Sequence, residues 1–423
     1  MINQNSIKTL QAMPFSQKFQ RPAYGSYCFA HIPDTIRRLF NFPAQNPLPD
    51  SVLPGWNDHQ NVIFFFIDGF GWRFLEEYGT DHPFLKELNS NGITSQITSM
   101  FPSTTAAHTA CIHTGSTVAQ NGVHEWFYYE PEVDQVISPL LFSVAGEKSR
   151  EQLARMGYHA QQFIPASQLY SDLRSVGVQP YVLNHREFAQ SSFSRQVCQG
   201  AMISEFQTIP EALVNLRLIL ESQPDQPKYI FLYIPNFDSI LHSYGPGSPQ
   251  SKAELFAWFD QMSYFLKSLR NLKRTLLLFS ADHGQSEADP RTTVYINNEI
   301  PNLIHTLKTN RQGEPLLFGG SPRDLFLYVQ NEHLEDIKIK LQKLLQGRAE
   351  IYETEELISR GIFGPGKDFD KLRSRMGNLV ILPFLGESVS WYKKDVFEQK
   401  YFGHHGGLSP EEMLIPFIAY PLR

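Results

Sequence analysis

The sequence is poor in cysteine and has no long apolar run, and each shortage excludes a class of protein. Among 423 residues there are three cysteines, Cys28, Cys111 and Cys198. An odd number at wide spacing fits neither a disulfide framework nor a cysteine zinc site, so we expect a reducing compartment. The longest apolar run, Val62–Ile67, is too short to cross a bilayer. No apolar signal-peptide core follows Met1. We therefore expect a cytoplasmic protein with no membrane span.

Positive charge is also in short supply. Lys and Arg total 37 against 43 Asp and Glu, which gives a net charge of −6. Binding along a nucleic acid duplex needs a basic face, so this partner is not expected. An anionic small molecule would have to be attracted locally, for example by metal ions. Hydrophobic residues at 42% and charged residues at 19% are typical of a globular chain, but they do not indicate its oligomeric state.

Three short apolar runs predict the centre of the fold. They are Val62–Ile67, Tyr229–Ile234 and Thr275–Phe279, and none alternates polar with apolar residues. Strands of this kind are buried on both faces, as in a parallel sheet covered by helices. Helical spacing is found between them, over Ile209–Leu220 and, after a candidate capping box at Ser251, through Leu269. The sequence thus predicts an α/β fold with a mostly parallel central sheet and helices on both faces.

The chain divides into three parts on the same evidence. Residues 1–60, with four prolines between positions 43 and 54, are expected to form an extended N-terminal segment. Residues 61–285 and 401–423 are expected to form the catalytic core. Residues 286–400 carry a strand and helix pattern of their own, which predicts a small inserted α/β cap subdomain.

Each of the three apolar runs leads into residues that bind metals. The first is followed by Asp68, the second by Asp238 and His242, and the third by Asp282 and His283. Ligands in open α/β sheets bind outside the carboxyl ends of the strands, so these side chains are expected to converge. Any one of them is most simply a turn residue, but together they favour a metal site. Carboxylate and imidazole ligands suit Zn²⁺ or Mn²⁺, and the ligands are numerous enough for two ions about 4 Å apart.

Two further segments belong to this pattern. In the segment 101–109, Thr105 precedes small residues that can begin a helix, which Gly115 would end. A hydroxyl at a helix N-terminus beside a divalent cation can act as a nucleophile, although an ordinary N-cap is the simpler interpretation. Near the C-terminus, glycines surround His404 and His405, which permits close approach to a metal or merely marks a turn.

In this order the segments resemble the alkaline phosphatase superfamily, and within it the type I phosphodiesterase/nucleotide pyrophosphatase branch. The resemblance extends from Asn61 to Phe417. It implies an alkaline phosphatase-like fold and a two-metal hydrolase of phosphodiester or pyrophosphate bonds. The motifs that carry it are FFFIDGFG, FPSTTAAHT, IPNFDSILHSYGP, SADHGQ and GHHGGLSPEEMLIPF.

The resemblance implies a role for each matching residue. Thr105 is the implied nucleophile, which forms a phosphothreonine intermediate, and the cofactors are two divalent ions, Zn²⁺ ahead of Mn²⁺. His405 is chosen over His404 because it directly precedes Gly-Gly. The implied ligands are Asp68, Thr105, Asp282 and His283 for one ion, and Asp238, His242 and His405 for the other.

One departure leaves the substrate open. The branch usually carries an asparagine shortly after the nucleophile helix, where it holds a phosphoryl oxygen, but here residues 122–126 contain none. His124, Glu125 and Trp126 in this stretch are candidate contacts to a phosphate ester or nucleotide-like substrate. A phosphomonoesterase, a phosphonate hydrolase or a catalytically silent metal-binding or ligand-binding homologue remain alternatives. A sulfatase is disfavoured, because its nucleophile motif is absent.

Overall fold

The computed structural model describes residues 1–55, 59–269, 272 and 274–422. Its main sheet has seven strands in the order β2-β17-β9-β1-β8-β6-β7. Every neighbouring pair is parallel except those made by β17, which runs antiparallel to β2 and β9. The strands are β1 (Asn61–Ile67), β2 (Ile93–Thr98), β6 (Gln179–His185), β7 (Met202–Phe206), β8 (Lys228–Ile234), β9 (Thr275–Ser280) and β17 (Leu414–Leu422).

The three predicted strands are the adjacent strands β9, β1 and β8 at the centre of this sheet. All seven residues of β1 are buried, as the run without alternation predicts. Successive β1 side chains still point to opposite faces. Phe65 packs on Phe265 and Phe279, whereas Phe66 packs on Phe29 and Phe231. The high aromatic content therefore fills two layers of core, one on each side of the sheet.

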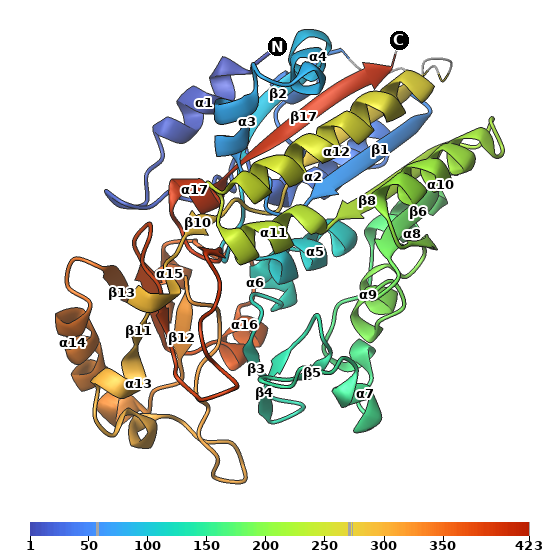
Figure 1. The fold of residues 1–423 in the computed structure, drawn as a ribbon. Helices are drawn as coiled ribbons and strands as arrows, with labels where there is room; N and C mark the ends of the chain where they lie inside the picture. The colour runs from blue at the N-terminus through green and yellow to red at the C-terminus, as the bar shows by residue number, and fades with distance from the viewer. Residues whose placement is uncertain (56–58, 270–271, 273, 423) are drawn as a thin grey trace.

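Helices cover both faces, which confirms the predicted fold class. The long helix α12 and the shorter α11 lie on one face, and α2, α5 and α8 lie on the other (Figure 1). None of the described helices combines the length and apolar character needed to cross a membrane. The helices around the main sheet are α2 (Ile32–Leu39), α3 (Trp72–Tyr78), α4 (Pro83–Asn91), α5 (Thr105–Thr114), α8 (Leu169–Ser175), α9 (Ser192–Val197), α10 (Ile209–Glu221), α11 (Asn236–Tyr244) and α12 (Pro249–Ser268).

The stretch predicted as a cap has its own sheet and a second apolar cluster. Its antiparallel sheet runs β12-β14-β13, and a parallel pair joins β11 to β15. The exact domain boundaries stay a prediction. The elements here are β11 (Val294–Tyr295), α13 (Ile296–Glu299), β12 (Leu325–Leu327), α14 (Leu334–Leu344), β13 (Ala349–Glu353), α15 (Thr354–Ser359), α16 (Asp370–Arg375), β14 (Leu379–Pro383) and β15 (Val389–Ser390).

A short ribbon joins the two ends of this stretch. The strand β10 (Ser286–Glu287) pairs antiparallel with β16 (Gly403–His404), with Ser286 opposite His404. The chain therefore enters and leaves the cap side by side. The ribbon lies just beyond His283 on one strand and just before His405 on the other. It thereby brings the C-terminal histidine segment back to the end of β9.

Two local expectations differ from the structure. The N-terminal residues are not extended throughout, because α1 (Gln4–Gln11) and α2 form before the proline-rich stretch of residues 43–54; α1 packs beside β2. The helix α12 begins earlier than the capping box at Ser251 suggests. Its N-cap is Ser248, whose side chain accepts a hydrogen bond from the Ser251 N–H, and Pro249 occupies the first turn, where proline is tolerated.

The remaining elements are short. A three-stranded meander, β3 (Tyr128–Glu130), β4 (Gln135–Ser138) and β5 (Ser143–Val144), follows α5. In the chain the meander is followed by α7, α8, β6 and α9. Three small helices complete the description: α6 (Val118–Asn121), α7 (Gln152–Arg155) and α17 (Pro410–Met413).

Candidate active site

The carboxyl ends of β9, β1 and β8 carry acidic and imidazole side chains to one place. Asp68 directly follows β1, Asp282 and His283 follow β9 after one residue, and Asp238 lies in the first turn of α11 after β8. Register explains the convergence, because Ile67 at the end of β1 pairs with Ile234 at the end of β8. Residues distant in sequence therefore meet at one edge of the sheet, as the sequence predicts.

The helix α11 adds a second ligand type to this edge. Asp238 and His242 stand one turn apart on the same face of α11, and His242 Nε2 lies 3.3 Å from Asp238 Oδ2. His405 reaches the other carboxylate oxygen, with its Nε2 3.9 Å from Asp238 Oδ1. His404, its neighbour in sequence, is paired in β16 instead.

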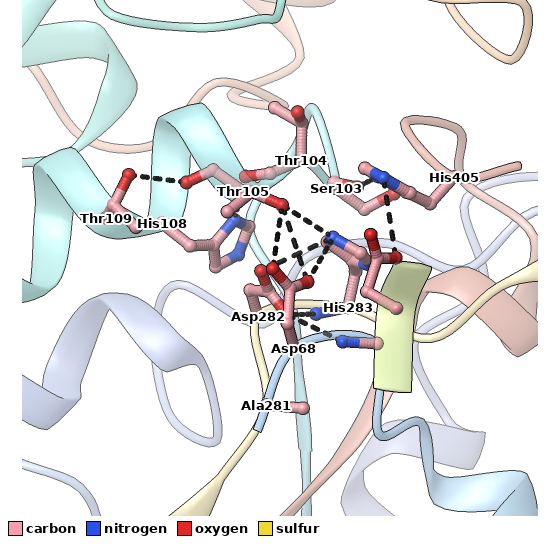
Figure 2. Close-up of polar contacts among 12 residues, drawn as sticks. Asp68, Ser103, Thr104, Thr105, His108, Thr109, Ala281, Asp282, His283 and His405 are labelled. Carbon is pink, nitrogen blue, oxygen red and sulfur yellow. Dashed lines mark hydrogen bonds and ion pairs between the residues drawn. The ribbon is translucent and has the colours of Figure 1, made fainter. Parts of the chain in front are cut away.

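Thr105 is the first residue of α5 and points into the same cluster (Figure 2). Its Oγ1 lies 3.2 Å from His283 Nε2 and 3.4 Å and 3.5 Å from the two carboxylate oxygens of Asp68. Thr104 is the N-cap and lies one position outside the cluster. The Thr104 side chain caps no N–H of α5, so the first-turn N–H groups are free for an anion.

Three histidines of the cluster are oriented in the same way. In each, Nδ1 faces a backbone carbonyl oxygen and must therefore donate to it: His242 to Gly403 at 2.7 Å, His283 to Gly284 at 3.0 Å, and His405 to Ser103 at 3.0 Å. Nε2 of each ring then has only a lone pair to offer. This arrangement is typical of histidines that bind metals, because the carbonyl fixes the ring and its tautomer.

Three carboxyl groups, those of Asp68, Asp238 and Asp282, are largely buried and close together, which disfavours the charged form of each. Burial raises the pKa of Asp68 well above its usual value, and the nearby Asp282 and Asp238 carboxylates raise it further. Burial also raises the pKa of Asp282. Asp238 keeps a lowered pKa in spite of its burial, because the His242 imidazole lies against it. Such crowding of buried carboxylates is unfavourable without compensating positive charge.

The acceptor atoms of Asp282, Asp68 and His283 lie close enough together to show whether a cation would fit between them. Asp282 Oδ1 accepts hydrogen bonds from the backbone N–H groups of Gly69 and His283, but its buried Oδ2 accepts none. That Oδ2 is 3.3 Å from His283 Nε2, and Asp68 Oδ1 is 3.4 Å from the same nitrogen. Burial lowers the pKa of His283 to about 4, so the ring is neutral at pH 7. Three hydrogen-bond acceptors therefore face one another without a proton between them, and a divalent cation would satisfy all three.

Among the residues that the structure describes, two sets of side chains meet the spacing needed for a metal ion. One is Asp238, His242 and His405, and the other is Asp68, Asp238 and His283, with the ligand atoms of each set within 4.8 Å of one another. Asp238 belongs to both sets and so lies between them. Nitrogen and oxygen donors without thiolate suit Zn²⁺ or Mn²⁺. Asp282 and Thr105 border the second set through His283.

Sequence reasoning missed two residues that hold the acidic candidate ligands. The Tyr233 hydroxyl donates to Asp68 Oδ2, and the Gln285 side-chain amide donates to Asp238 Oδ1. Tyr233 lies within an apolar run and is easily taken for a core residue. Gln285 ends the SADHGQ motif, so its place beside two candidate ligands was the only signal that could have found it. Both fix the direction in which a carboxylate presents its free oxygen.

A pocket of about 240 Å³ opens beside Thr105, Asp68 and Asp238. Trp126, one of the predicted substrate contacts, lines it. The other two, His124 and Glu125, are fully buried and do not line it. The His124 ring packs against Tyr128 and Phe326. Substrate contact by these two residues stays a prediction, and in this structure the turn that exposes Trp126 directs both side chains into the core.

Glu125 instead contacts a second buried carboxyl group, Asp324. Both side chains are fully buried, and Glu125 Oε1 and Asp324 Oδ2 have no hydrogen-bond partner among the described residues. Burial raises the pKa of Glu125 to about 7 and that of Asp324 well above its usual value. Two contacting carboxyl groups avoid mutual repulsion by sharing a proton. The pair connects the turn before Trp126 to the loop before β12.

The family of the chain follows from comparison with known sequences. A family model described as type I phosphodiesterase/nucleotide pyrophosphatase matches residues 62–408. The chain belongs to this family. It is accordingly a hydrolase with an alkaline phosphatase-like fold, as the ordered motifs indicate. A search of curated protein sequences finds no match to the chain.

Solved structures of ectonucleotide pyrophosphatase/phosphodiesterase 5 share this family fold. The mouse protein, as an inactive threonine-to-alanine variant in complex with AMP, has a TM-score of 0.64 and 15% identity over 86% of this chain and 88% of its own. A second mouse structure gives 0.63 and 16% over 85% and 88%. The human protein gives 0.64 and 15% over 85% and 88%. At these identities the likeness concerns the fold alone.

Proposed function

We propose that this member of the family hydrolyses phosphodiester or pyrophosphate bonds of a small phosphate ester or nucleotide-like substrate, with Thr105 as nucleophile. The observation that carries the proposal is the position of Thr105 Oγ1, 3.2 Å from His283 Nε2 and 3.4 Å from Asp68 Oδ1, at the mouth of the pocket. A hydroxyl so placed among candidate ligands suits phosphoryl transfer better than an N-cap role, because Thr104 and not Thr105 occupies the N-cap position of α5.

The lone-pair geometry supports two divalent cations, Zn²⁺ or Mn²⁺. Asp68, Thr105, Asp282 and His283 would hold one, and Asp238, His242 and His405 the other. When bound, such ions lower the pKa of a coordinated hydroxyl or water and neutralise charge on phosphoryl oxygens. Tyr233 and Gln285 would keep the free oxygens of Asp68 and Asp238 directed at them.

The chain's own groups then account for two chemical steps. Thr105 Oγ1 loses its proton to water and attacks phosphorus, which forms the Thr105 O–P bond and breaks the bond to the leaving oxygen. The leaving oxygen takes up a proton from water. The uncapped N–H groups of the first turn of α5 donate to the phosphoryl oxygens as charge builds up on them. Water next attacks phosphorus, which releases phosphate or a monoester and restores the Thr105 hydroxyl. The AMP-bound mouse relative is inactive as a threonine-to-alanine variant, which agrees with such a nucleophile.

The decisive experiment compares the wild type with Thr105→Ala. With added Zn²⁺ or Mn²⁺, we expect the wild type to cleave bis-p-nitrophenyl phosphate in a chelator-sensitive reaction. We expect loss of the nucleophile to lower kcat by a factor of about 10³ or more. Thr9→Ala, on α1 and outside the site, is the matched control. Near-normal turnover by Thr105→Ala would refute the proposed role of this residue.

A phosphomonoesterase is the second candidate, and a specific observation favours it. No asparagine is present in the turn where the family places one, and Trp126 lines the pocket there instead. The ratio of kcat/KM for bis-p-nitrophenyl phosphate over p-nitrophenyl phosphate distinguishes the two. A ratio above one supports the diesterase, and a ratio far below one supports the monoesterase. Bound metal without any turnover would indicate a silent homologue.

A further inference from the structure

The pocket beside Thr105 extends over β6 and α9 to a wall that the reaction itself does not use. This wall is aromatic, with Phe188 and Phe193 among its residues, but it also carries two polar side chains, Arg150 and Asn184. Arg150 lies between β5 and α7, and Asn184 lies near the carboxyl end of β6. Arg150 is the one lysine or arginine among the described residues that line the pocket.

Arg150 is a half-buried cation without an anionic partner. One of its terminal nitrogens donates to the Leu140 carbonyl at 3.1 Å, and its guanidinium lies 5.7 Å from the ring centre of Phe188. No carboxylate of the described residues lies within ion-pair distance of it. The neighbouring Glu151 is turned away and accepts hydrogen bonds from Ser192. The guanidinium therefore keeps donors free beside a pocket that excludes part of the solvent, where an anion would be bound strongly.

Asn184 supplies the second, independent observation. The residue is buried, with 6% relative exposure, and lines the pocket. Its side chain forms no hydrogen bond with any described residue, and its Oδ1 is enclosed without a partner. A buried amide that is left unpaired costs free energy. Its exposed pocket side can donate to an oxygen of a bound molecule. At this edge the Tyr233 hydroxyl and the Gln285 side-chain nitrogen, by contrast, each have a hydrogen-bond partner.

Ring contacts connect this wall to the reacting end of the pocket. Phe188, beneath Arg150, packs edge-on against Tyr233 at 5.7 Å, and Tyr233 in turn donates to Asp68. We propose that Arg150 and Asn184 bind an anionic group, a carboxylate or a second phosphate, on the organic part of the substrate. The aromatic wall between them and Thr105 contacts the apolar body of that substrate. This inference rests on the proposed function and specifies its substrate class.

Three matched substrates test whether the pocket prefers a substrate with an anionic group on its second ester. They are 4-nitrophenyl phosphodiesters whose second ester group is phenyl, 3-carboxyphenyl or 3-carbamoylphenyl, assayed with the Zn²⁺-loaded wild type. We expect kcat/KM for the carboxylate to exceed that for the amide by about tenfold or more, mainly through KM. In Arg150→Met this ratio should fall to near one. Asn184→Asp keeps the side-chain size but adds a negative charge to the pocket. In this variant the ratio of kcat/KM for the carboxylate over the amide should fall below that of Arg150→Met. Arg174→Met, exposed on α8, is the control and should keep the wild-type ratio.

Direct binding separates this inference from the proposed function. Calorimetry with phenyl phosphate, 3-carboxyphenyl phosphate and 1,3-phenylene bisphosphate requires no turnover, and it shows whether carboxylate or phosphate is preferred. Tighter binding of either ligand with a second anionic group than of phenyl phosphate, seen in the wild type but not in Arg150→Met, supports the inference even if no diester is cleaved. Cleavage of the phenyl diester without any effect of Arg150→Met on the charge preference or on binding would overturn the inference and leave the proposed function intact.

Discussion

Three histidines show how single residues would prepare the proposed metal site before an ion binds. Each donates from Nδ1 to a carbonyl oxygen of the main chain, and two of these carbonyls belong to Gly403 and Gly284. The rings are therefore fixed by the backbone and do not depend on other side chains. The acidic ligands are held differently, by Tyr233 and Gln285. Loss of either side chain changes ligand orientation without removing a ligand.

We expect Tyr233→Phe to weaken cation binding while leaving the fold intact. The change removes only the hydroxyl that donates to Asp68 Oδ2. Loss of such a supporting hydrogen bond lowers metal affinity by about 10- to 100-fold. Competition with a fluorescent zinc chelator measures the change. Tyr181→Phe, on the neighbouring strand β6, is the control, and equal affinities in the two variants would contradict the positioning role.

The carboxyl pair predicts how stability depends on pH. Because the pKa of Glu125 is raised to about 7 in the folded protein, its protonated form contributes stability that is full below pH 4.5 and is lost as pH rises through 7. Glu125→Gln replaces the proton with an amide donor. We expect it to stabilise the protein at pH 8 by at most about 3 kcal/mol and to have no such effect at pH 4.5. Thermal midpoints at the two pH values measure this, and a gain independent of pH would contradict it.

At the scale of the element, the close approach of β16 to α11 requires a glycine. A Cβ on Gly403 would lie 2.5 Å from the Leu241 carbonyl oxygen, which is backbone and cannot move aside easily. The same Gly403 carbonyl accepts the hydrogen bond of His242. Local packing and ligand orientation thus depend on one position.

We expect Gly403→Ala to displace β16 from α11 and to disturb the set Asp238, His242 and His405. The cost in stability should be about 1–3 kcal/mol, as for other overpacked sites, and the occupancy of one metal ion per chain should fall. Gly25→Ala is the control, since a Cβ there meets nothing within 4 Å. Thermal midpoints and elemental analysis after dialysis check both effects. Two bound ions in Gly403→Ala would show that the ribbon tolerates the side chain.

Elements buried on both sides of the sheet could be predicted from the sequence because their apolar runs are continuous. The strands β1, β8 and β9 and the helices α10 and α12 are found within a few residues of the predicted positions. The strand β17 could not be placed beside β9, because its pairing with β2 and β9 joins segments that are distant in sequence. Arg150 and Asn184 were missed for the same reason, since neither belongs to a local motif. The unpaired charge of Arg150 and the burial of Asn184 become evident only in the folded structure.

At the scale of the whole molecule, a buried ion pair joins the cap to the core. Arg323, before β12, donates through Nε and a terminal nitrogen to both carboxylate oxygens of Glu412 in α17, at 3.0 Å and 2.8 Å. Both side chains are fully buried. The orientation of the Arg323 guanidinium is also fixed by a hydrogen bond that it donates to the Phe384 carbonyl at 2.7 Å. It fixes how the loop before β12 meets the C-terminal strand.

We expect Arg323→Met to destabilise the protein by about 3–5 kcal/mol, because it leaves the Glu412 carboxylate buried and unpaired. The double variant Arg323→Met/Glu412→Leu should recover much of this loss, since no charge is then stranded. Thermal unfolding of the wild type, the single variant and the double variant measures both changes. A double variant as unstable as the single one would show that shape, and not stranded charge, accounts for the loss.

The ribbon formed by β10 and β16 has a consequence for how the protein tolerates change. Because Ser286 pairs with His404, the separation of His283 and His405 is set by a pair of hydrogen-bonded strands and not by the number of residues between them. Loops of the intervening segment that face solvent can therefore lengthen or shorten while the histidines keep their spacing. The size and shape of this segment are in this way free to diverge while the spacing of the two histidines stays constant.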